Sequence, residues 1–112
     1  MKPIRRGLFG VLIALLAVPG MAQTFAVPGE FWQAPRSGQA VRAEPQLQLA
    51  FTAYLQSERA RLRLHHQKRD ESIAQAEELR GWLIALGVEA ERIEMVDDNP
   101  LNTIKIEIME IR

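Results

Sequence analysis

The chain has 112 residues, carries 14 basic and 14 acidic side chains, and contains no cysteine. The lack of cysteine excludes a disulfide framework, a thiolate metal site, a cysteine nucleophile and the usual diacylated-lipoprotein anchor. A chain of this length builds one hydrophobic core, so we expect a single domain whose stability comes from packing alone.

The first 22 residues have the order of a cleavable export signal: basic, then apolar, then small. The basic side chains are Lys2, Arg5 and Arg6. The apolar run, residues 7–18, is 12 residues long, whereas a membrane-spanning helix needs about 20. We therefore expect cleavage after Ala22, or else after Ala26, and release into the periplasm with no stable membrane span. Retention of the segment as a short anchor is the alternative.

Removal of residues 1–22 changes the charge balance of the chain. It leaves 11 basic and 14 acidic side chains, a net charge of −3. A mildly acidic protein is a poor general binder of nucleic acid, so we expect no nucleic-acid partner.

Residues 23–38 have turn and linker composition, with two prolines and two glycines and no sustained period. We predict an irregular arm here, followed by a folded domain over residues 39–112. Phe31 and Trp32 lie in the arm, where large aromatic residues need a surface to cover them. They could dock on a partner as binding anchors, or they could fold back onto the domain, which we favour. The Arg36-Ser37-Gly38 stretch reads only as a turn.

The first half of the domain alternates between strand and helix patterns. A short strand is expected at residues 39–42, and Pro45 suits the first turn of a helix. The apolar residues that follow recur with helical spacing and predict one buried face: Leu47, Ala50, Phe51, Tyr54 and Leu55. Residues 59–66 alternate polar and apolar, which predicts a half-buried strand.

A second helix is expected after the polar turn at residues 68–72. Ser72 and Gln75 have the spacing of a capping box at its start. The helix should run to about Leu86, with Gly87 in the left-handed conformation that ends many helices. Trp82 is expected to pack in the core or at its rim.

Two more alternating segments, residues 92–96 and 103–111, predict the last two strands. The order β-α-β-α-β-β then indicates an α+β fold, a two-layer sandwich with two helices on one face of a mixed four-stranded sheet. The other face should present polar side chains to water: Arg61, Arg63, His65, Glu94, Lys105 and Glu107.

This order, the strand ARLRLHH and the stretch AEELRGWLIALGVEAERIEMV resemble the C-terminal domain family of OmpA-like proteins, the peptidoglycan-associating modules of bacterial envelopes. The resemblance covers about residues 39–111. It implies an envelope location, and it places the family's G-H-T-D signature on residues 64–67. The family's binding aspartate then falls on Gln67 and its binding arginine on Gln75. Because both charged anchors are substituted, the resemblance implies the scaffold without its usual ligand chemistry.

His65 and His66 form the one pair that invites a metal or catalytic role. Neighbouring side chains on a strand point to opposite faces, so the two imidazoles are not expected to share an ion. We expect structural histidines, no metal, no cofactor and no enzymatic activity, because no set of acid, base and nucleophile can be assembled.

The arginines and His65 of residues 59–65 could form a cationic strip for a polymer or lipid headgroup. We favour instead a solvated sheet face that pairs with Glu94 and Glu107 across strands. The function expected from the sequence is a non-enzymatic periplasmic interaction module of the cell envelope that binds a protein partner through Phe31, Trp32, Arg61, Arg63 or His65. Binding of peptidoglycan or another cell-wall polymer through a rearranged site is the alternative.

Overall fold

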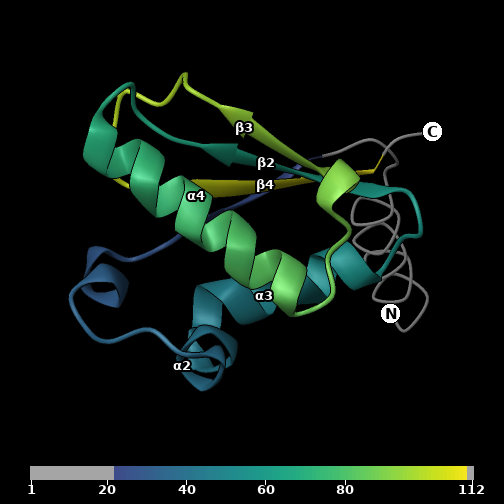
Figure 1. Cartoon of the computed structure of the whole chain (residues 1–112). Coiled ribbons are helices and arrows are strands. Elements are labelled where there is room, and N and C mark those ends of the chain that lie inside the picture. Colours follow the sequence, from purple (N-terminus) through teal and green to yellow (C-terminus); the bar gives the residue numbers. More distant parts are fainter. Residues whose placement is uncertain (1–21, 111–112) are drawn as a thin grey trace, which may run out of the picture.

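A computed structural model of the chain describes residues 22–110, in which a layer of helices covers one face of a mixed sheet (Figure 1). The strands are β1 (Gln23–Ala26), β2 (Ala60–His65), β3 (Ile93–Val96) and β4 (Lys105–Glu110), in the spatial order β1-β4-β2-β3. The helices are α2 (Gly38–Ala43), α3 (Pro45–Leu55) and α4 (Asp70–Ala85), with 3-10 turns η1 (Gly29–Trp32) and η2 (Ala90–Arg92). The predicted α+β class, with a mixed four-stranded sheet in a two-layer sandwich, is confirmed. The predicted export signal lies almost wholly outside the described residues.

The first strand is not where the sequence pattern indicated. Residues 39–42 belong to α2, which begins where the Ser37 hydroxyl accepts a hydrogen bond from the Ala40 amide at 3.1 Å. The first strand is β1, which pairs antiparallel with β4 from Gln23 opposite Ile108 to Ala26 opposite Lys105. The prediction of an irregular arm over residues 23–38 is therefore wrong at its start, and so is a domain boundary at residue 39.

Helix α3 begins at Pro45, as predicted, and Glu44 caps it by accepting from the amide of Gln46. Its buried face is narrower than the apolar pattern suggested. Leu47, Ala50 and Tyr54 are buried, whereas Leu55 is 76 % exposed. The prediction that Leu55 belongs to the core face is wrong: Leu55 is the last residue of α3, and the buried face of the helix ends one residue earlier, at Tyr54.

Strand β2 lies in the interior of the sheet, antiparallel to β4 and parallel to β3. Leu62 and Leu64 are 2 % and 0 % exposed, while the intervening Arg63 is partly exposed, so the predicted alternation is confirmed. Helix α4 connects β2 to β3 and packs over this apolar face, as a crossover between parallel strands must. The core thus lies between β2 and β4 on one side and α3 and α4 on the other.

The start of α4 differs from the expected capping box. The helix begins at Asp70, and Ser72 lies buried in its first turn, where its hydroxyl accepts a hydrogen bond at 2.9 Å from the Gln67 amide. Asp70 and Glu71 place negative charge against the positive end of the helix dipole. The serine therefore ties the preceding turn to the helix instead of capping it.

The end of α4 is as predicted. Gly87 has φ +115°, a left-handed conformation that side chains disfavour. The Gly87 amide donates to the Ile84 carbonyl at 3.1 Å, and the Val88 amide donates to the Leu83 carbonyl at 2.9 Å. This pair of bonds is the Schellman arrangement that closes a helix.

Strand β4 inserts Ile104, Ile106 and Ile108 into the core, each at most 4 % exposed. Its pairing with β2 stays regular to Glu110, which lies opposite Ala60. Ile111 lies outside the described residues. Among residues 22–110, no helix is both long and apolar enough to cross a bilayer.

Candidate functional site

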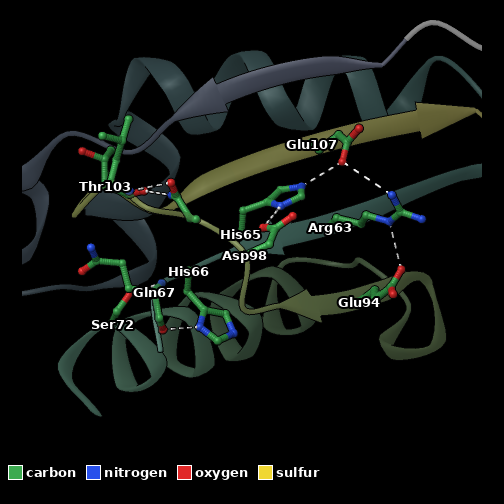
Figure 2. A network of polar contacts seen from close by, with 11 residues as sticks. Arg63, His65, His66, Gln67, Ser72, Glu94, Asp98, Thr103 and Glu107 are labelled. Atoms are coloured by element: carbon green, nitrogen blue, oxygen red, sulfur yellow. Dashed lines mark hydrogen bonds and ion pairs between the residues drawn. The ribbon is translucent and has the colours of Figure 1, made fainter. Parts of the chain in front are cut away.

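The sheet face turned away from α3 and α4 carries a cluster of charged side chains, which we call the sheet-face network (Figure 2). It consists of Arg63, His65, Glu94, Asp98 and Glu107. The alternation along β2 places Arg63 and His65 on this face, because Leu62 and Leu64 point to the other. The carboxylates come from β3, β4 and the loop between those strands.

Arg63 lies opposite Glu94 on one side and Glu107 on the other in the strand register. Its Nε donates to Glu94 Oε1 at 3.0 Å, and its Nη1 lies 4.0 Å from Glu107 Oε1. The Arg63 side chain is 41 % exposed. The cross-strand pairing that we favoured from the sequence is therefore present at Arg63.

His65 is held between two carboxylates. Its Nδ1 lies 2.7 Å from Asp98 Oδ1 and its Nε2 lies 2.8 Å from Glu107 Oε1 (Figure 2). Partial burial lowers the pKa of His65, but the hydrogen bonds to Asp98 and Glu107 outweigh it, so the pKa lies above its usual 6.5. In the protonated imidazole both ring nitrogens donate, one to each carboxylate, so the two contacts favour the charged form.

The position of Asp98 depends on a loop that the sequence marked only as a turn cluster. Asn99 is 7 % exposed and accepts from the Leu101 amide at 3.0 Å, while its side-chain nitrogen donates to the Thr103 carbonyl. The Asn99 amide also donates to the His66 carbonyl at 3.1 Å. Asn99 is a buried organiser that sequence reasoning missed, although an asparagine before Pro100 is a known turn signal.

A shallow hollow of about 330 Å³ opens beside His65. Its lining is polar and mixed in charge: Thr24, His65, Asp98, Asn99, Pro100, Lys105 and Glu107. Both ring nitrogens of His65 contact carboxylates, at 2.7 Å from Asp98 and 2.8 Å from Glu107. Within residues 22–110, no group of three or more His, Asp or Glu side chains is arranged to hold a metal ion. The arrangement is suited to charge recognition at a surface.

His66 points to the opposite side from His65, as predicted for neighbours on a strand (Figure 2). It is 7 % exposed, and its Nδ1 lies 2.8 Å from the Gln67 carbonyl oxygen. Its amide donates to the Val96 carbonyl at 2.9 Å. His66 is thus a buried part of the turn that leads from β2 into α4.

The two glutamines at the substituted anchor positions lie apart from the sheet-face network. Gln67 donates to the Pro100 carbonyl at 3.0 Å and accepts from Arg69 at 3.2 Å, so it ties two loops together. Gln75 lies half-buried on the second turn of α4.

Arg61, another residue predicted to bind a partner, donates a hydrogen bond to the Glu91 carbonyl at 2.9 Å, next to η2.

The segment with Phe31 and Trp32 packs against the core, which is the fold-back alternative. The two rings meet edge to face with centroids 5.0 Å apart, and the Arg36 guanidinium lies 5.5 Å from the Trp32 ring centroid. Arg36 also donates two hydrogen bonds to Glu78 of α4, at 2.7 and 2.9 Å, a pair of contacts that we call the Arg36–Glu78 clamp. The hydrogen bond from Arg36 lowers the pKa of Glu78, which accepts from Trp82 as well. No local pattern predicts this clamp, since its partners lie 42 residues apart.

We compared the chain with models of protein families, with curated proteins and with solved structures, and found no match in any of the three. The fold and the sheet-face network define a small α+β protein with a charged, open sheet face.

Proposed function

We propose that this protein is an exported, non-enzymatic interaction module of the cell envelope, and that it binds a protein partner through the open sheet face. One observation carries the proposal: His65 is fixed by carboxylates on both ring nitrogens, and Arg63 shares one of those carboxylates. Charged side chains held in one geometry lose little conformational freedom on binding, which is the advantage of a preorganised surface.

The sheet face suits this role better than the segment with Phe31 and Trp32. Both aromatic rings are half-buried against the domain, and Arg36 clamps the segment to α4 through Glu78. An anchor that is already packed must be released before it can dock elsewhere. The partner surface therefore centres on Arg61, Arg63 and His65.

The location belongs to the same proposal. Support comes from the basic, apolar and small-residue order of residues 1–22 and from the resemblance to OmpA-like C-terminal domains. Gln67 stands where that family has an aspartate and is engaged with the Pro100 carbonyl, which favours a scaffold used for something other than the family's ligand.

Crosslinking in living cells tests the proposal. A photo-reactive amino acid is placed at position 61 or 63 on the sheet face, at 31 or 32, and at Glu71 and Glu77 on the exposed side of α4 as matched controls. We expect a discrete protein adduct from 61 and 63 and none from the α4 positions. If no position captures a protein, the proposal fails.

Binding of a cell-wall polymer is the second candidate, and the hollow beside His65 favours it, because Lys105 and Glu107 line it together and could contact a charged polymer. Sedimentation with purified sacculi separates the two. Salt-resistant co-pelleting that Arg61→Ala and Arg63→Ala abolish would favour the polymer. Detectable turnover of cell-wall fragments would contradict the non-enzymatic part of the proposal.

A further inference from the structure

The two carboxylates that contact His65 differ in how firmly the fold holds them. Asp98 belongs to the β3–β4 loop, lies 2.7 Å from Nδ1 of the ring, and has a side chain that is 59 % exposed. Glu107 belongs to β4, lies 2.8 Å from Nε2, and has a side chain that is 19 % exposed. Arg63 also lies 4.0 Å from Glu107. One carboxylate is thus held within the sheet, whereas the other comes from an exposed loop.

The surroundings of His65 include every element next to it on the sheet face. Its own strand, β4 and the β3–β4 loop bring four charged side chains to it: Arg63, Lys105, Glu107 and Asp98. Strand β3 places the apolar Val96 opposite His65, while its Glu94 pairs with Arg63. Strand β1 contributes the uncharged Thr24 to the neighbouring hollow. The proton of His65 is therefore the positive charge that lies directly between Asp98 and Glu107.

Loss of that proton makes the two contacts incompatible. A protonated imidazole donates from both nitrogens, whereas a neutral imidazole has one N–H group and one lone pair. The neutral ring can therefore donate to only one of the two carboxylates. An unpaired carboxylate costs more free energy the more it is withdrawn from water, so the N–H group stays with the less exposed Glu107. The lone pair on Nδ1 then faces Asp98 and repels it.

The loop can release Asp98 without unfolding, because the residues on either side of it are held separately. The Val96 carbonyl accepts a hydrogen bond from the His66 amide at 2.9 Å, and the Asn99 amide donates to the His66 carbonyl at 3.1 Å. These two bonds attach both ends of the short Asp97-Asp98 stretch to the turn after β2. A movement of Asp98 is thus confined to two residues, and it opens the side of the 330 Å³ hollow that Asp98 lines.

We infer that His65 is a proton-controlled latch for Asp98. With its second proton bound, His65 holds Asp98 against the sheet face. Without that proton, Asp98 is released to water and Nδ1 of the ring faces the hollow. The hydrogen bond from His65 lowers the pKa of Asp98. Partial burial lowers the pKa of His65, but the bonds to Asp98 and Glu107 raise it above its usual value, as expected if each group stabilises the charge on the other.

The inference goes beyond the proposed function, because the latch belongs to the free protein and is measured without a partner. Its consequence for binding rests on the proposed function: a partner on the sheet face meets a held Asp98 at low pH and a released Asp98 at high pH. The two proposals fail separately. A chain that gives no crosslinked adduct can still show the latch, and a chain without the latch can still give an adduct.

The test is an NMR titration of the full chain from about pH 5 to about pH 9, which spans the range in which histidines titrate. Nitrogen shifts of the imidazole report its protonation and, above the midpoint, its tautomer. We expect the neutral ring to carry its proton on Nε2. The amide and carboxyl signals of Asp98 should change with the same midpoint as His65, and the Asn99 amide should keep its hydrogen bond to the His66 carbonyl throughout.

Two variants assign the midpoint to the Asp98 contact. Asp98→Asn removes the negative charge beside Nδ1 and should lower the midpoint of His65 by about one unit, as expected for loss of an adjacent opposite charge. Asp97→Asn is the matched control, because it removes an exposed carboxylate one residue earlier in the same loop. It should change the midpoint much less. Circular dichroism checks that both variants stay folded.

Three results would overturn the inference. The first is an Asp98 signal that does not follow the titration of His65 in the native chain. The second is a neutral ring with its proton on Nδ1, which would mean that Asp98 is kept and Glu107 is released. The third is an equal shift of the midpoint in Asp97→Asn and Asp98→Asn, which would assign the effect to the general charge of the loop.

Discussion

His65 and Glu107 lie on neighbouring strands, two positions out of direct register, and are joined by a hydrogen bond of 2.8 Å between Nε2 and Oε1. The residue directly opposite His65 is Lys105, and the residue directly opposite Glu107 is Arg63. Because of this diagonal contact, the Glu107 carboxylate lies next to both His65 and Arg63. Glu107 therefore connects the two basic side chains of the sheet-face network, and the predictions for that face start from its carboxylate.

The network makes folding stability dependent on pH. The pKa of His65 is raised in the folded state, so its contribution is fully present below about 6.5 and is lost as the pH rises through the folded pKa. The hydrogen bond from His65 lowers the pKa of Asp98, so that contribution is present above 3.8 and is lost as the pH falls through the folded pKa. Urea unfolding should thus show higher stability at pH 5.5 than at pH 8, and an NMR titration should place the His65 pKa above 6.5.

Variants assign this pH dependence to the network. His65→Gln should remove most of the difference between pH 5.5 and pH 8, and Glu107→Gln should lower the pKa of His65 by removing one of its two acceptors. His66→Gln serves as the control for loss of a histidine elsewhere in the turn. A His65 that titrates at or below 6.5 in the native chain would contradict the assignment.

The end of α4 offers a matched pair of glycines. Gly87→Ala forces a side chain into the left-handed conformation at φ +115° and should destabilise the fold by about 1 kcal/mol. Gly81→Ala lies inside the helix, where the added methyl group meets no atom within 4 Å beyond its chain neighbours and the helix's own backbone, and should stabilise the fold by about 0.5–1 kcal/mol. Thermal unfolding of both variants checks the opposite signs, and equal signs would contradict the Schellman ending.

The Arg36–Glu78 clamp should hold residues 29–36, the segment that precedes α2, against the rest of the domain. Arg36→Ala removes both hydrogen bonds to Glu78 and the cation over the Trp32 ring. We expect faster amide hydrogen exchange over residues 29–36 with little change in the sheet, measured by mass spectrometry. Lys68→Ala, at an exposed position in another loop, is the control. Unchanged exchange in Arg36→Ala would show that the aromatic contacts hold the segment alone.

The apolar core is tested at the centre of the sheet. Leu64→Ala, at 0 % exposed on β2, should destabilise the fold by about 2–5 kcal/mol because it leaves a cavity. Leu101→Ala, at 54 % exposed in the β3–β4 loop, should change stability by no more than about 0.5 kcal/mol. Similar losses in urea unfolding would contradict the described burial.

Elements with a strong period could be predicted from the sequence. The alternation through Leu62 and Leu64 defined β2, the isoleucines from Ile104 to Ile108 defined β4, and Gly87 marked the end of α4. Each of these is a local property, because the side-chain period and the left-handed conformation are set within a few residues.

The failures came where a short segment depends on distant partners. Four residues at 39–42 fit a strand as well as a helix; in the structure they belong to α2, which the Ser37 side chain caps and which buries Val41. The four residues of β1 form a strand because β4 pairs with them, about 80 positions along the chain. The candidate site follows the same rule: alternation predicted which face His65 takes, but its contact with Asp98 depends on a loop fold that Asn99 organises.

The central claim, that a protein partner binds the preorganised sheet face, is tested most directly by crosslinking in cells from position 61 in three backgrounds. We predict one discrete adduct in the native background and an equal yield with Glu77→Gln on the exposed side of α4. Glu107→Gln should reduce the yield several-fold, because it removes the carboxylate shared by Arg63 and His65. A yield that Glu107→Gln leaves unchanged, or no adduct in any background, would contradict the claim.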